Sequence, residues 1–132
     1  MRLPAGRLAS LDEFEAVAQA MLERLPARFR DGLGNVSLSV TNFASRDTLQ
    51  AMGIEDRYDL LGLYEGAGLP SQSVWDPVRL PDRIFLYRIP IMDYARRERQ
   101  RPERVIRHVL IHEIGHHFGF SDADMARIED DV

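Results

Sequence analysis

The stretch PERVIRHVLIHEIGHHFGFSDADM, residues 102–125, contains all 4 histidines of the chain. Pro102 suits the first turn of a helix, and residues 102–120 carry apolar side chains on nearly every side. A helix that is apolar all round normally lies at the centre of a domain. We therefore predict a buried central helix that positions the histidines.

His112 and His116 are four residues apart, so on a helix they lie one turn apart and about 40° apart around the axis. Two imidazoles at this spacing can converge on one metal ion. His108 extends the same stripe, but it would lie about 12 Å along the axis from His116. Zinc holds nitrogen at about 2.0 to 2.1 Å, so His108 and His116 cannot both bind the same ion.

The residue that follows the first ligand decides between the two possible histidine pairs. The pair His112 and His116 places Glu113 there, where a carboxylate can take a proton from a metal-activated water. The pair His108 and His112 would place Val109 there, which has no acid–base chemistry. We therefore predict His112 and His116 as metal ligands and Glu113 as the general base.

A catalytic zinc site needs a third protein ligand and keeps its fourth position open for water. Gly119 follows His116 by three residues and is the residue type that most readily ends a helix in the left-handed conformation. Asp122 comes three residues later, where its carboxylate can return to the metal. Asp124 and Glu129 are also near and stay open as alternatives to Asp122.

The other histidines and the tyrosines are predicted to have packing roles. His117 lies about 140° around the helix from His112, so we expect it to pack or to support the site rather than bind the metal. His108 is expected to be partly buried and to face a polar neighbour. Three tyrosines could stabilise an oxyanion but are expected to pack their rings and expose their hydroxyl groups: Tyr64, Tyr87 and Tyr94.

The stretch HEIGHHFGFSD fits the HExxHxxGxxD form of the extended zincin motif, with aspartate in place of the third histidine usual in metzincins. Together with LLGLYEG, DRIFLYR and SDADM, it makes the chain resemble small bacterial zincin-like metallopeptidases over roughly residues 35–125. The resemblance implies Zn2+ as cofactor, held by His112, His116 and Asp122, with Glu113 as general base.

The same resemblance implies an α+β fold, in which a small mixed sheet of three to four strands packs on helices. The metal would lie at the helix that carries HExxH, below an edge strand. Metzincins have a methionine turn well downstream of the motif, whereas Met125 follows almost at once here. We therefore expect Met125 to pack in the core.

The remaining elements are predicted from hydrophobic periodicity and capping residues. Residues 10–29 predict an amphipathic helix with Ser10 as cap and Glu13 three residues on. The others are strands at residues 35–43, 59–66 and 82–91, a short helix at residues 45–53 closed by Gly53, and an acidic helix at residues 121–132 begun by Ser121 or Asp122.

Two segments are predicted to lack regular structure. Residues 1–9 are expected to form a loose tail, and residues 67–82 a loop that carries the only tryptophan, Trp75. Residues 96–104, rich in arginine, are expected to form the solvated approach to the central helix.

With 132 residues and 45% hydrophobic composition, the chain is expected to form one domain over residues 1–132. The absence of cysteine excludes disulfides and thiolate metal ligands. The net charge of −4 and the scattered basic residues argue against a nucleic-acid partner. No signal peptide or membrane span is evident, so a cytoplasmic location without membrane contact is expected.

The leading functional hypothesis is zinc-dependent hydrolysis of a peptide or protein substrate. A metal-dependent endoribonuclease is an alternative, but Glu113 and the acidic balance of the chain argue against it. The other alternative is a regulatory module that binds zinc without turnover, because 132 residues leave little room for a deep specificity pocket.

Overall fold

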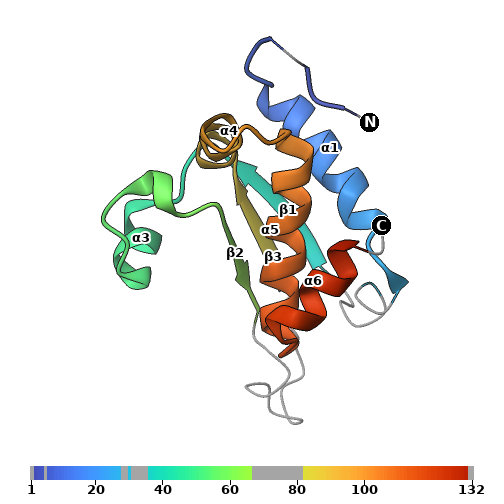
Figure 1. Cartoon of the computed structure of the whole chain (residues 1–132). Helices are drawn as coiled ribbons and strands as arrows, with labels where there is room; N and C mark the ends of the chain where they lie inside the picture. Colours follow the sequence, from blue (N-terminus) through green and yellow to red (C-terminus); the bar gives the residue numbers. More distant parts are fainter. Residues whose placement is uncertain (1, 5, 28–29, 31–35, 67–81, 131–132) are drawn as a thin grey trace.

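The computed structural model of the chain describes residues 2–4, 6–27, 30, 36–66 and 82–130 (Figure 1). The predicted loop at residues 67–82, with Trp75, lies outside the described residues except for its last position. The helices and strands are α1 (Leu11–Glu23), β1 (Val36–Thr41), α3 (Arg46–Met52), the 3-10 turn η1 (Arg57–Asp59), β2 (Gly62–Glu65), β3 (Asp82–Tyr87), α4 (Arg88–Arg97), α5 (Pro102–His117) and α6 (Asp122–Asp130).

The strands form a mixed sheet in the order β1-β3-β2. β1 runs parallel to β3, and β2 runs antiparallel to β3. β2 therefore lies at one edge of the described sheet. α5 lies across one face of the sheet (Figure 1). This arrangement confirms the predicted α+β fold with a small mixed sheet.

The central position predicted for the histidine helix is also confirmed. α5 contributes more fully buried side chains than any other described element, and its apolar residues join those of β3, α1 and α6 in one core. The side chains of α5 in this core are Val105, Ile106, Val109, Leu110, Ile111 and Ile114. Among the described helices, none is long and apolar enough to cross a membrane.

The predicted capping box of α1 is present. The Glu13 backbone N–H donates to the Ser10 hydroxyl at 3.1 Å, and the Ser10 N–H donates to the Glu13 carboxylate at 3.0 Å. The helix ends at Glu23, earlier than predicted, because Pro26 follows and the residue before a proline is disfavoured in helical conformation. The shorter helix at residues 45–53 is confirmed as α3, with Gly53 closing it.

The predicted strand at residues 82–91 is wrong in its second half. β3 ends at Tyr87, and α4 begins at the next residue, with Pro90 in its first turn. A proline is tolerated there because the first N–H groups of a helix have no partner within it. Ile91 and Ala95, one turn apart, bury against the core, so helical packing decided the conformation of a short apolar run.

Residues 96–101 are exposed, as expected for the solvated approach to the central helix, whereas the prediction for the N-terminal tail needs correction. Arg96 and Arg97 belong to the last turn of α4, where both pair with Asp93 at 2.9 Å. In the tail, the side chains of Leu3 and Ala9 are buried in the core rather than loose. Backbone contacts hold this segment, because the N–H of residue 3 donates to the buried Glu103 carboxylate, and the carbonyl of residue 9 accepts from Arg88.

Candidate metal centre

The turn between α5 and α6 brings the second helix back along the first. Gly119 has a φ of 75°, in the left-handed region, as predicted for the residue that ends the helix. The N–H of Gly119 donates to the carbonyl of His116 at 3.2 Å, and the N–H of Phe120 donates to that of Gly115 at 2.9 Å. These bonds satisfy the last carbonyls of α5 and reverse the chain.

Hydrogen bonds fix both ends of α6 in this position. Ser121, one of the two predicted caps, accepts the N–H of Asp124 at 3.1 Å. At the other end, the guanidinium of Arg107 in α5 donates to the carbonyls of Glu129 and Ile128, at 3.0 and 3.3 Å. The two helices therefore run antiparallel with a defined register.

The structure brings together the three predicted metal ligands. One side-chain donor atom from each of His112, His116 and Asp122 lies within 4.8 Å of the other two. Nε2 of His116 lies 3.9 Å from Oδ1 of Asp122. The side chains of His116 and Asp122 are 61% and 90% exposed, so this group opens to solvent. Two imidazoles and a carboxylate are a donor set that zinc accepts.

The alternative ligand Asp124 is engaged elsewhere. Its carboxylate accepts the N–H of Ser121 and pairs with Arg127 in the next turn of α6. It belongs to neither of the two groups of potential metal ligands found among the described residues. Its position therefore favours Asp122 as the third ligand beside His112 and His116. These three residues are called the first group below.

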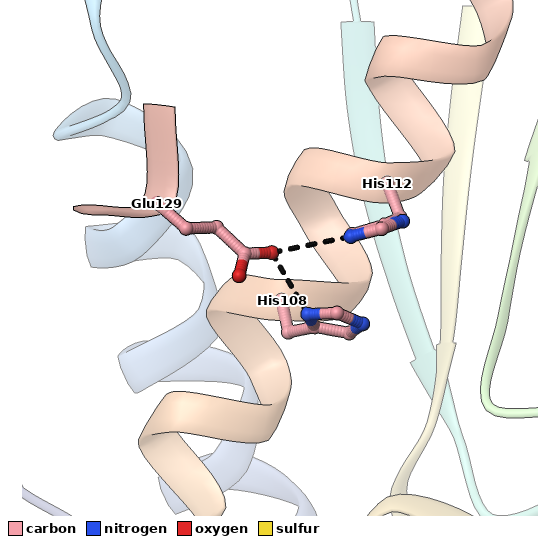
Figure 2. Close-up of side chains that lie close together, drawn as sticks. All are labelled: His108, His112 and Glu129. Carbon is pink, nitrogen blue, oxygen red and sulfur yellow. Dashed lines mark ion pairs between the residues drawn. The ribbon is translucent and has the colours of Figure 1, made fainter. Parts of the chain in front are cut away.

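Glu129, the other alternative, lies against His108 and His112 instead (Figure 2). Its Oε1 atom is 2.8 Å from Nδ1 of His108 and 3.3 Å from Nε2 of His112. The two imidazole rings lie with their centroids 4.0 Å apart. The expectation that His108 faces a polar neighbour is confirmed, although its side chain is 54% exposed and therefore less buried than expected.

The grouping of His108 with Glu129 was not predicted, but the spacing of the sequence contains a signal for it. Asp122 and Glu129 are seven residues apart, which is about two helical turns, so both lie on one face of α6. His108 and His116 are eight residues apart on one face of α5. When two such helices pack antiparallel, each carboxylate meets a different end of the histidine stripe.

Glu113 is half-buried beside the first group, next to the edge strand β2. Burial raises the pKa of its carboxyl group, and this rise is opposed in part by the charge of His116 and by a hydrogen bond from the backbone of Tyr64. β2 can approach α5 closely because Gly62 lacks a side chain, and a Cβ there would lie 2.6 Å from Cγ1 of Val109. The edge strand thus positions the predicted base.

The environment of His112 favours a neutral imidazole. Burial lowers its pKa, as does the nearby charge of His108, whereas the carboxylate of Glu129 acts in the opposite direction. A neutral imidazole has a lone pair available for a metal ion, and a protonated one has none. The direction of the pKa shift of His112, the residue shared by the two groups, therefore favours metal binding.

The packing roles predicted for His117 and Tyr64 are confirmed. Their rings stack with centroids 4.1 Å apart. The Tyr64 hydroxyl donates to Oδ2 of Asp82 at 2.7 Å, and burial together with this bond raises the pKa of the phenol.

The other two tyrosines also pack their rings. Tyr87 is buried in a small cluster with Ala44 and Leu60, so the expectation that its hydroxyl group is exposed is wrong. Its pKa is raised by burial and by the charges of Glu65 and Glu113. Tyr94 is half-buried and packs against the main core.

A mixed sheet crossed by a central helix defines a small α+β domain. That helix carries two histidines one turn apart and a neighbouring glutamate, and with a returning carboxylate they form a group that could hold a metal ion. The sequence model of a family described as zincin-like metallopeptidase matches residues 33–132. The chain therefore belongs to this family, which implies a bound metal ion and peptidase chemistry. Comparison with curated protein sequences finds no significant match.

Proposed function

We propose that this protein is a zinc-dependent peptidase. His112, His116 and Asp122 would hold the zinc ion, and Glu113 would act as general base. The observation that carries the proposal is the position of Glu113, half-buried and hydrogen-bonded to β2, beside a solvent-open group of two imidazoles and a carboxylate.

Zinc bound to such a group lowers the pKa of water and polarises a carbonyl group. Glu113 would accept the proton of the attacking water and donate it to the leaving amine. Its raised pKa makes its carboxylate a better proton acceptor than an ordinary glutamate, so the shift has the direction that base catalysis near neutral pH requires. The hydrogen bond from Tyr64 holds the carboxylate in place for both transfers.

The proposed substrate is an extended peptide segment. β2 pairs with β3 on one side only within the described sheet, so its other edge offers backbone groups to an extended chain. That strand also positions Glu113, so a peptide bound along it would pass close to the base. The open first group supports the same substrate, because a long chain needs an accessible site rather than a closed pocket.

Cleavage of a mixed peptide library by the zinc-loaded protein tests the proposal, with Glu113→Gln as the decisive variant. We expect Glu113→Gln to remain folded and to keep zinc. Its cleavage rate should fall by a factor on the order of 10² to 10⁴. Glu15→Gln, an exposed change of the same kind on α1, serves as control and should cleave like the parent. Full activity of Glu113→Gln would show that the assigned base is wrong.

Two other outcomes distinguish the alternative functions. A folded parent protein that retains zinc but cleaves no peptide in the library would indicate a binding module. Cleavage of RNA, with binding that weakens steeply as salt rises, would indicate a nuclease instead.

A further inference from the structure

We propose that His108, His112 and Glu129 form a second metal site, which goes beyond the peptidase function and does not depend on it. Figure 2 shows the three side chains, of which His112 also belongs to the first group. A divalent ion that accepts two imidazole nitrogens and a carboxylate oxygen, such as Zn2+, is the ligand this donor set suits.

The distances between the donor atoms are close to those around one tetrahedral ion. Zinc holds its nitrogen and oxygen ligands at about 2.0 to 2.2 Å, so two ligand atoms lie roughly 3.3 Å apart. Nε2 of His112 is 3.3 Å from Oε1 of Glu129. Nδ1 of His108 is 2.8 Å from the same oxygen, so an ion would require this pair to open by a small side-chain rotation.

The state of the Glu129 carboxylate supports a cation at this position. Its Oε1 atom is shielded from solvent and has no hydrogen-bond partner among the described residues. The two imidazole nitrogens are close to it, yet neither makes a hydrogen bond of good geometry to it. A buried carboxylate oxygen without a partner is unfavourable, and an ion between the three donors would satisfy it.

The second site also has an anchored ligand and a route for ions. Arg107 holds the backbone of Glu129 against α5, so the carboxylate is fixed near the histidines. His108 and Glu129 both line a cavity of about 820 Å³. The same cavity is lined by the acidic residues Glu103 and Asp130 and by the basic residues Arg104 and Arg107, so it is polar and gives an ion access to the two ligands.

The two sites cannot both hold an ion at the same time. A neutral imidazole carries a single lone pair, so His112 can bind an ion in one site or in the other, but not in both. His108 lies about 140° around the helix from Glu113, whereas His116 lies about 60° from it. An ion in the second site is therefore held on the side of α5 away from the proposed base.

Zinc titration of the full chain, stripped with a chelator and measured against a competing metal-binding dye, tests this proposal. The parent should bind one Zn2+ per chain. His116→Ala removes a ligand of the first group only and should still bind one Zn2+. His108→Ala in the His116→Ala background should weaken binding by at least about ten-fold, because even loss of an indirect partner of a metal ligand costs this much.

Matched variants separate a lost ligand from a damaged fold. His117→Ala in the His116→Ala background removes the same number of histidines, and it should bind zinc as His116→Ala does. Glu129→Gln in that background is isosteric and should weaken binding as His108→Ala does. Circular dichroism should show the native helix content for every variant in the comparison.

Either of two results would overturn the second site. One is that His116→Ala binds no zinc, and the other is that the added His108→Ala and Glu129→Gln changes leave its affinity unaltered. Two zinc ions per chain in the parent would overturn the exclusion through His112. These experiments measure metal binding alone, so their result holds even if the parent cleaves no peptide. Failure of the peptidase proposal would show in the cleavage assay instead.

Discussion

The side chain of Met125 in α6 packs directly onto Gly115 in α5, between the two histidines of the motif. A Cβ at position 115 would overlap the sulfur of Met125 and lie 2.8 Å from its Cγ. Met125 is fully buried, which confirms its predicted role in the core. The close approach of α6, and with it the position of Asp122 and Glu129, therefore depends on the missing side chain of Gly115.

Gly115→Ala should push α6 away from α5. We expect the free energy of unfolding to fall by about 1 to 3 kcal/mol, the usual effect of overpacking a core, and zinc affinity to fall as well. Chemical denaturation and zinc titration measure the two effects. Adding Met125→Ala removes the overlapping atoms, so the double variant should lose less stability than the sum of the single changes. Strict additivity would show that the contact does not limit the approach.

Arg107→Ala should release the C-terminal end of α6. The guanidinium donates to two backbone carbonyls there, and charge-assisted bonds of this kind contribute about 1.5 kcal/mol or more to stability. We expect a loss of about that size in urea denaturation. Arg104→Ala removes an exposed arginine of the same helix and should change stability much less. Equal losses for both variants would contradict the anchoring role.

Tyr64→Phe tests whether the hydroxyl of Tyr64 takes part in the reaction. The hydroxyl is bound to Asp82, so the change should cost about 1 kcal/mol of stability and less than about ten-fold in peptide cleavage. Loss of a group that stabilises an oxyanion costs on the order of 10² to 10³ in rate. Steady-state cleavage by the zinc-loaded variant distinguishes the two, and a loss in the larger range would assign Tyr64 to the catalytic machinery.

The contribution of Glu13 to stability should depend on pH. The hydrogen bond from Arg7, together with that from the backbone of Ser10, lowers the pKa of Glu13 from 4.5 to about 2. Because the folded value lies below the unfolded one, the stabilisation is complete above pH 4.5 and is lost as the pH falls toward 2.

Thermal unfolding of Glu13→Gln checks this dependence. The variant should unfold at a lower temperature than the parent at pH 7, and the difference should shrink as the pH falls below 4.5. Glu15→Gln, two positions along the same helix, provides the control. A difference that stays constant over this pH range would contradict the role of the ionised carboxylate.

Local patterns predicted most of the elements that carry the site. The apolar helix, the left-handed residue at Gly119 and the capping residues all act within a few positions along the chain, so their effects can be read without tertiary contacts. The same holds for the convergence of His112, His116 and Asp122, because it follows from one helical turn and one chain reversal.

Features that depend on packing between distant segments were missed. The run DRIFLYRIPI places apolar residues at consecutive positions on both sides of Arg88, so it has no clear period that could show that α4 begins there. The burial of Leu3 depends on Glu103, far along the chain, and no local pattern contains that contact. The meeting of Glu129 with His108 required the docking direction of α6, which is set in part by Met125.

All candidate ligands of both groups lie on two consecutive helices joined by one tight turn. Bringing such neighbours together closes only a short loop, whereas the parallel pairing of Val36 with Asp82 must close a long one and is entropically more costly. If these side chains hold an ion, as proposed, the helical hairpin brings its ligands together without any strand pairing. Metal supply during synthesis would then influence how fast the chain reaches its native state, and not only whether the finished protein is active.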